Sequence, residues 1–158
     1  MKKLLLLGVV VLFVAMDATA QFGSEDRDAN AESGNRFIGA WRLAWLEEPD
    51  ADGKVRRVDC TGLLVYTRDG HMSVQVMYGH PQAENSTTPV QYAQGGYEAS
   101  FGRYEVDDAH SFTYRVEGAL VRTLIGKHLK RAYELSGNQL IVKSADPNEH
   151  WKVAWEHY

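Results

Sequence analysis

A period-two alternation of apolar and polar side chains constrains this chain most, because it runs from Gly39 to the C-terminus with a turn after each short stretch. Successive side chains of a strand point to opposite faces, so the pattern predicts β-strands with one buried face. In the first strand, Trp41, Leu43 and Trp45 are expected to share one face. Asp69-Gly70 between two apolar runs is a strong signal for a β-hairpin.

These strands predict an all-β fold, a single antiparallel β-barrel. About eight to ten strands joined by tight turns suit a barrel better than a sandwich, and a closed barrel has no free edges at which apolar strands would aggregate. Val90, Ala93 and Tyr97 recur at helical spacing, which predicts one short helix within Pro89–Ser100, either a lid or an ordinary connection. A barrel of this size holds one small ligand or is filled by its own side chains.

Residues 1–20 have the features of a secretory signal peptide. Lys2 and Lys3 precede an apolar stretch from Leu4 to Met16, and small residues at 18–20 suit a cleavage site. The apolar stretch is shorter than the ~20 residues that a transmembrane helix needs, so we expect no membrane span after cleavage. The sequence therefore predicts an exported protein, periplasmic or secreted.

The remainder divides into a leader and one domain. Residues 21–35 are rich in Asp, Glu, Ser, Gly and Asn, and Phe22 is their only large apolar side chain, so we expect a flexible leader. Residues 36–158 have the size of one domain and contain no linker or internal repeat. This segment is the predicted barrel domain.

Charge and cysteine content restrict the partners and the source of stability. Without residues 1–20 the chain has 15 basic and 20 acidic residues, a net charge of −5. A mildly acidic surface without a dense Lys/Arg run argues against nucleic acid as a partner. Cys60 is the only cysteine, so no intrachain disulfide is possible, and we interpret it as a small half-buried apolar residue.

The sequence gives no indication of a metal or a cofactor. Its six histidines fall mainly in turns or at strand ends, without the close pairing of zinc ligands. There is no glycine-rich phosphate loop, dinucleotide fingerprint or nucleophile elbow. We therefore expect no metal site and no cofactor.

Four sequence blocks occur in order: GAWRL at 39–43, DCTGLLVYTRDGHMSVQ at 59–75, GYEASFGRYEV at 96–106 and VEG at 116–118. Together they resemble the bacterial and fungal lipocalin-like domain family, a calycin-type β-barrel, from Gly39 to Glu156. Where this family often has proline before Thr-Gly-Leu-Leu, this chain has Cys60. The resemblance implies a barrel that binds a small hydrophobic or amphipathic ligand.

The block at 39–43 also resembles the Gly-x-Trp element of lipocalins, formed here by Gly39 and Trp41. That likeness implies a structural role, with the Trp41 ring closing one end of the barrel. It further implies a basic side chain across the ring, and Arg131 and Lys152 are the two candidates.

Candidate ligand contacts are polar side chains on the strands, since ligand cavities combine apolar walls with a few polar groups. Alternation divides the hairpin at 63–77 into a face with Leu64 and Tyr66 and a face with Gln75 and Met77, and either face suits the interior. An inward arginine among Arg103, Arg115, Arg122 and Arg131 would hold a carboxylate. The best candidates are Tyr66, Gln75, Tyr104, Tyr114, Arg115 and Tyr133.

Three functions remain open at this level. The first is an exported protein that binds a small hydrophobic or amphipathic molecule. The second is a small enzyme of isomerase or cyclase type in which Glu105, Glu117 or Tyr104 transfers protons, although the glutamates equally suit surface ion pairs with arginine. The third is a filled barrel that acts through its surface. The sequence does not define the oligomeric state.

Overall fold

The computed structural model describes residues 34–50, 52–79 and 92–158. The signal peptide predicted at 1–20 and nearly all of the leader predicted at 21–35 lie outside the described residues. Within them, the strands are β1 (Gly39–Pro49), β2 (Val55–Val58), β3 (Cys60–Tyr66), β4 (His71–Tyr78), β5 (Tyr97–Asp108), β6 (Ser111–Ala119), β7 (His128–Ser136), β8 (Gln139–Ser144) and β9 (Lys152–His157).

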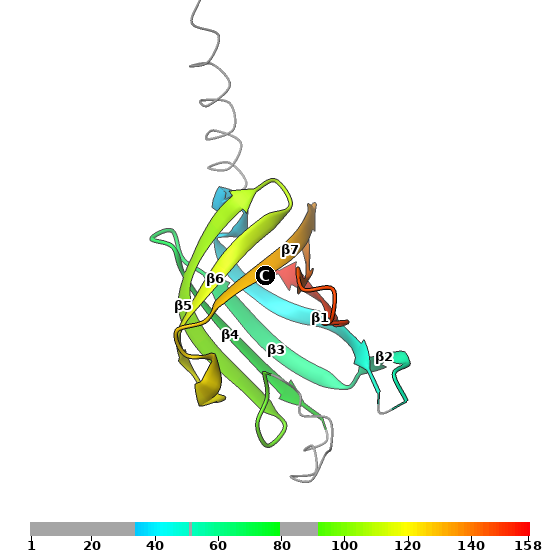
Figure 1. Ribbon diagram of the computed structural model, residues 1–158. Coiled ribbons are helices and arrows are strands. Elements are labelled where there is room, and N and C mark those ends of the chain that lie inside the picture. Colours follow the sequence, from blue (N-terminus) through cyan, green and yellow to red (C-terminus); the bar gives the residue numbers. More distant parts are fainter. Residues whose placement is uncertain (1–33, 51, 80–91) are drawn as a thin grey trace, which may run out of the picture.

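The predicted antiparallel barrel is confirmed (Figure 1). Each strand from β3 to β9 pairs with the next, and β1 pairs with both β3 and β9, so eight strands close into a barrel. The short β2 adds to the end of β1, where Leu46 pairs with Val58. Closure satisfies the backbone hydrogen bonds of β1 on both sides, which an open sheet would leave exposed.

Helical conformation in the described residues is limited to one turn at 34–37 and the 3-10 helix η1 (Arg122–Leu124). None of it is long and apolar enough to cross a membrane. The described part of Pro89–Ser100 contains no helix: residues 92–96 form a turn, and Tyr97 already begins β5, while 89–91 lie outside the described residues. Gly95 and Gly96 have φ angles of 62° and 79°, which a right-handed helix does not allow.

The hairpin predicted at Asp69-Gly70 forms between β3 and β4, with Leu64 opposite Val74. Gly70 adopts a φ of 84°, the left-handed conformation that this turn requires. The inward face, which sequence alternation left open, is the one that carries Leu64 and Tyr66. The opposite face carries Met77, which is 55% exposed.

A β-bulge in β1 changes which side chains point inwards. The pairing of β1 with β9 shifts by one residue between Leu43 and Trp45, which leaves Ala44 without a partner. Trp41 and Leu43 pack in the core, whereas the ring of Trp45 lies under the Arg57 guanidinium at 5.2 Å from its centroid. The expectation that all three share one face is therefore wrong, because the extra residue reverses the alternation.

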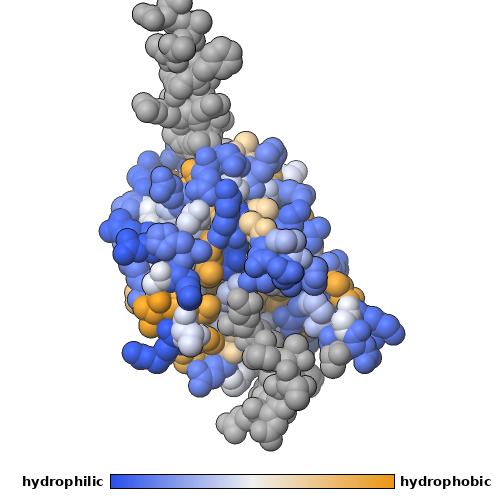
Figure 2. Space-filling view, viewed as in Figure 1, coloured by the Kyte–Doolittle hydropathy of each residue, from blue (hydrophilic) through white to orange (hydrophobic). Residues whose placement is uncertain are grey.

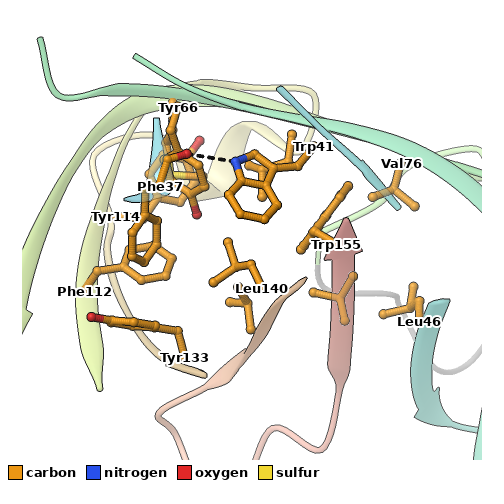
Figure 3. Close-up of a cluster of buried hydrophobic side chains, with 14 of the residues drawn as sticks. Phe37, Trp41, Leu46, Tyr66, Val76, Phe112, Tyr114, Tyr133, Leu140 and Trp155 are labelled. Atoms are coloured by element: carbon orange, nitrogen blue, oxygen red, sulfur yellow. Dashed lines mark hydrogen bonds between the residues drawn. The ribbon is translucent and has the colours of Figure 1, made fainter. Parts of the chain in front are cut away.

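Aromatic side chains fill one end of the barrel, and we call this cluster the aromatic plug (Figure 3). The turn at 34–37 inserts Phe37, which is completely buried, with its ring centroid 5.0 Å from that of Tyr66. The plug consists of Phe37, Tyr66, Tyr104, Phe112 and Tyr133. Burial of one such ring contributes on the order of 2–3 kcal/mol, so the plug anchors the fold at this end.

Gly39 and Trp41 lie beside the plug. Trp41 is 1% exposed, and its ring meets the His157 ring edge to face at a centroid distance of 4.7 Å. Gly39 has a φ of 138°, and a Cβ at this position would collide with the His157 ring. A larger residue in place of Gly39 would therefore displace the end of β9.

The outer wall of β5 is unusual because apolar side chains point to solvent. Tyr97 and Phe101 are 36% and 57% exposed, whereas Glu98 and Ser100 between them line the interior. Figure 2 shows apolar surface gathered at the lower left, over the region of β5 and β6. Alternation at the start of β5, from Tyr97 to Phe101, thus runs opposite to the usual apolar-in, polar-out arrangement, which returns from Arg103 onwards.

Candidate ligand-binding cavity

A cavity of about 490 Å³ begins at the aromatic plug, where Tyr66 and Phe112 line it, and extends towards the other end of the barrel. It lies where β1, β4 and β6 end and where β5, β7 and β9 begin. Its volume falls within the ~300–1,000 Å³ that is typical of small-molecule sites. The apolar wall is formed by Leu46, Leu64, Val74, Val76, Val116, Leu124, Leu129, Val142 and Val153, and Trp151 and Trp155 also line it.

Glu98, the second residue of β5, places its carboxyl group in this apolar surrounding. Burial raises its pKa, the positive charge of Arg131 opposes this and the charge of Glu48 adds to it, and the net result is a pKa of about 7. No hydrogen bond or ion pair joins the Glu98 carboxyl group to another described residue. Glu98 is half-buried, and a carboxyl group in apolar surroundings without a partner is costly, so this position calls for a functional explanation.

Glu48 enters the cavity because the bulge at Ala44 turns the end of β1. The Tyr78 hydroxyl donates a hydrogen bond to Glu48 Oε2 at 3.3 Å. Burial raises the pKa of Glu48, and the hydrogen bond from Tyr78 partly offsets this. The cavity therefore contains a second carboxyl group, which is partly satisfied by the protein itself.

Arg131, on β7, belongs to a cluster that we call the arginine cluster, formed with Tyr92, Glu149 and Trp151. The guanidinium carbon lies 5.1 Å from the centroid of the Tyr92 ring and 4.9 Å from that of Trp151. Arg131 Nη1 is 3.6 Å from Glu149 Oε2. The side chains of Arg131 and Glu149 are only 9% and 16% exposed, so solvent screens this pair weakly.

Glu149 is held firmly in the arginine cluster. Its carboxylate accepts hydrogen bonds from the Tyr92 hydroxyl at 2.9 Å and from Trp151 Nε1 at 3.1 Å. Burial alone would raise the pKa of Glu149, but these hydrogen bonds, another from Ser144 and the charge of Arg131 lower it. In the arginine cluster, the positive charge of Arg131 is thus neutralised by the carboxylate of Glu149 at the mouth of the cavity.

Tyr114, on β6, also lines the cavity, and its hydroxyl is buried. This oxygen has no hydrogen-bond partner among the described residues, although the residue is only 4% exposed. Burial raises the pKa of the Tyr114 phenol to about 12, and the neighbouring Ser100 side chain acts in the opposite direction. The Ser100 side chain is close enough to act on this hydroxyl, but no bond of ordinary geometry forms, so the hydroxyl can bond to a ligand in the cavity.

The lipocalin-like domain model matches residues 38–156, which is most of the chain and all nine strands except the last residue of β9. The chain belongs to the lipocalin-like domain family. No curated protein matches this lipocalin-like chain.

Solved structures similar to this lipocalin-like domain include two from Bacteroides. One is a lipocalin-like protein from Bacteroides uniformis, with 17% identity over 78% of this chain and 99% of that chain and a TM-score of 0.47. The other is an uncharacterized protein from Bacteroides eggerthii, with 17% identity over 77% of this chain and 99% of that chain and a TM-score of 0.46.

Of the ligand contacts predicted for the lipocalin-like domain, Tyr66 and Tyr114 line the cavity. Gln75 and Arg115 are exposed on the outer wall of the barrel. Tyr104 and Tyr133 belong to the aromatic plug, and the Tyr104 hydroxyl donates to the Thr67 carbonyl at 3.2 Å. The structure therefore brings two of the six candidates to one site.

The glutamates considered for proton transfer lie on the outside of the lipocalin-like barrel. Glu105 and Glu117 are both exposed, and Glu117 Oε1 is 3.5 Å from Arg103 Nε. Both side chains point away from the cavity on the outer face of the barrel, so neither reaches the interior. The carboxyl groups that do line the interior, Glu48 and Glu98, were missed at the sequence level.

Of the four arginines considered for an inward position, Arg131 alone lines the cavity, while Arg103, Arg115 and Arg122 are exposed. The resemblance to lipocalins implied that Arg131 or Lys152 would lie across the Trp41 ring. Arg131 instead contacts Tyr92 and Trp151 at the other end of the barrel, and His157 occupies the place beside Trp41.

Among residues 34–50, 52–79 and 92–158, no cluster of His, Cys, Asp or Glu has a geometry that would hold a metal ion. Cys60, in β3, is half-buried. Burial and the nearby charges of Glu48 and Asp59 raise the pKa of its thiol to about 11. The thiol is therefore protonated at neutral pH and poorly nucleophilic.

Proposed function

We propose that this lipocalin-like protein is exported and binds a small hydrophobic or amphipathic molecule inside its barrel. The observation that supports this most is the cavity of about 490 Å³ with its apolar wall and few polar groups. An apolar guest would gain about 25 cal/mol for each Å² that it buries there. A barrel completely filled by its own side chains would not leave such a volume.

Export rests on the sequence pattern of residues 1–20, a charged start followed by an apolar stretch and small residues. The test is the N-terminus of the protein recovered from the periplasm or culture medium of its own host. A mature N-terminus at Gln21 is expected, and a full-length protein retained in the cytoplasm would contradict export.

Binding is tested first by native mass spectrometry of the protein purified from its host, because a retained molecule would be seen as added mass. Titration with fatty acids and aromatic metabolites then follows the fluorescence of Trp151 and Trp155, which line the cavity. We expect a saturable change with at least one class. A folded protein that carries no added mass and responds to none of them would contradict the proposal.

A matched pair of variants locates the binding site. Val142 points into the cavity and Ile141, its neighbour on β8, points out of it. Val142→Phe fills part of the cavity and should weaken binding about tenfold or more, whereas Ile141→Phe should leave it unchanged. Equal effects of the two substitutions would place the bound molecule elsewhere.

A second candidate function is a proton-transfer enzyme of isomerase or cyclase type, and the position of Glu98 favours it. A carboxyl group with a pKa of about 7 inside an apolar cavity has the properties of a general acid or base. If the molecule retained from the host is converted by the protein, Glu98→Gln should abolish turnover even at saturating concentrations of that molecule. Unchanged turnover in this variant would exclude Glu98 as the proton-transfer group.

A further inference from the structure

The polar groups of the cavity restrict the chemistry of the guest, and this inference rests on the proposed binding function. Among the described residues, the lining includes the carboxyl groups of Glu48, Asp50, Glu98 and Glu149 but only one arginine, Arg131. His150 also lines the cavity and is exposed at its rim. The interior therefore carries an excess of negative charge once these acids ionise.

The only arginine of the lining is not available to a ligand carboxylate. Arg131 lies over the Tyr92 and Trp151 rings and is paired with Glu149. A carboxylate ligand would have to displace Glu149, whose oxygens also accept hydrogen bonds from Tyr92 and Trp151. It would also approach Glu48 and Glu98, and like charges in a weakly hydrated space repel strongly.

The acids of the cavity differ in how far the protein satisfies them. Glu149 is paired with Arg131, Asp50 is paired with Arg56, and Glu48 accepts a hydrogen bond from Tyr78. Glu98 has no such partner among the described residues. The Glu98 carboxyl group is therefore the hydrogen-bond acceptor that a donor group of the ligand would satisfy.

The Tyr114 hydroxyl is a second, independent indication of a polar ligand group. It is buried, faces the same cavity and makes no hydrogen bond of ordinary geometry among the described residues, although the Ser100 side chain is close enough to act on it. Glu98 and Tyr114 line the same cavity, and the charge of Glu98 raises the pKa of the Tyr114 phenol. A phenol oxygen accepts as well as donates, so it suits a ligand with several N–H groups.

We infer that the cavity selects an apolar molecule with a protonated amine, whose N–H groups bond to the Glu98 carboxylate and the Tyr114 oxygen. Glu48 adds negative charge from the facing strand, and the apolar wall takes the hydrocarbon part. A purely apolar molecule would leave Glu98 and Tyr114 unsatisfied, and a carboxylate would be repelled. An ammonium group avoids both problems. It donates hydrogen bonds to Glu98 and Tyr114, and its positive charge supplies the partner of opposite sign that a buried carboxylate requires.

The test compares three probes with the same ten-carbon chain: decylamine, 1-decanol and decanoic acid. Their binding to the full mature protein is measured by isothermal titration calorimetry at about pH 8, below the concentrations at which they form micelles. The wild-type protein is compared with Glu98→Gln, and the control is Glu105→Gln on the exposed outer face of the same strand. Circular dichroism checks that each variant is folded.

We expect decylamine to bind about tenfold to a hundredfold more tightly than 1-decanol, and decanoic acid to bind most weakly. Glu98→Gln should remove most of the preference for the amine over the alcohol, and Glu105→Gln should leave it intact. Tyr114→Phe should reduce amine affinity a few-fold without unfolding the protein, which supplies a second variant at an independent position.

Two results would overturn the inference alone: decanoic acid binding as tightly as decylamine, or an amine preference that survives Glu98→Gln. In either case the barrel still binds an apolar chain, so the proposed binding function is not contradicted. A folded protein that binds none of the three probes would instead contradict the binding function and the amine selectivity together.

Discussion

The indole Nε1 of Trp41 donates a hydrogen bond to the backbone carbonyl of Phe37 at 2.8 Å (Figure 3). This bond fastens the turn at 34–37 to β1 and holds the Phe37 ring inside the barrel. One end of the barrel is thereby closed by residues that precede the first strand. The cavity extends from this plug to the other end of the barrel, where Tyr92 and Trp151 pack around Arg131.

Removal of the Phe37 ring should therefore cost much of the stability. We expect Phe37→Ala to lower the free energy of unfolding by about 3–5 kcal/mol, because it leaves a large void among packed rings. Phe101→Ala on the outer wall, where the ring is 57% exposed, should cost less than about 1 kcal/mol. Urea denaturation of both variants gives the comparison, and similar losses would mean that the plug does not anchor the fold.

Two ion pairs of similar length and different burial should differ in strength. Arg131–Glu149 spans 3.6 Å with side chains 9% and 16% exposed, and Arg103–Glu117 spans 3.5 Å with side chains 57% and 38% exposed. Double-mutant cycles to methionine and glutamine should give a coupling of about 2 kcal/mol or more for the first pair and less than about 1 kcal/mol for the second. A coupling near zero for both would show that the arginine cluster is not held by charge.

The Glu98 carboxyl group should make stability depend on pH in an unusual direction. Its pKa is about 7 in the folded protein and near the ordinary 4.5 in the unfolded chain, so the folded state binds more protons between these values. The stabilisation from the protonated group is complete below about pH 4.5 and is lost as the pH rises through about 7. Glu48 on β1 and Arg131 on β7, which act on Glu98 across the cavity, stay in place in the variant below.

The stability of the Glu98→Gln variant should therefore increase relative to that of the wild type as the pH increases. Between about pH 5 and pH 8, the difference in the free energy of unfolding should shift in favour of the variant by the order of 2 kcal/mol. Chemical denaturation at several pH values measures this difference. Glu105→Gln serves as the control, and its free energy of unfolding should depend on pH as that of the wild type does. The same pH dependence in Glu98→Gln would disprove the raised pKa of Glu98.

The unpaired Tyr114 hydroxyl leads to a prediction about the free protein. Tyr114→Phe removes a buried polar atom that has no partner among the described residues, so it should be neutral or should raise the free energy of unfolding by up to about 1 kcal/mol. Tyr78→Phe is the contrast, because the Tyr78 hydroxyl donates to Glu48 and its loss leaves that acid less satisfied. Thermal melts followed by circular dichroism distinguish the two, and a marked loss for Tyr114→Phe would reveal a bond that this hydroxyl makes.

Much of the architecture follows from the sequence because it depends on local patterns. Alternation and the Asp69-Gly70 turn predicted the barrel and the β3–β4 hairpin. The bulge at Ala44 was not predicted, since one additional residue in a strand leaves no mark in composition. It decides that Trp45 faces outwards and that Glu48 faces the cavity.

The site was less predictable for a related reason. The spacing of Val90, Ala93 and Tyr97 suggested a helix, and this concealed the first residues of β5. Even if the strand had been predicted correctly, the apolar character of Tyr97 and Phe101 would have predicted that they point into the barrel and that Glu98 points to solvent. Only closure of the sheet, with β5 between β4 and β6, fixes the face on which Glu98 lies.

The barrel thus divides its tasks along its axis. Rings packed around Phe37 hold the strands together at one end, while the other half encloses the cavity. Substitutions at lining positions outside the hydrophobic core, such as Glu98, can change the guest without removing core packing. Such an arrangement lets one framework acquire new specificities by replacing a handful of wall residues, with Glu98 as the first position to vary.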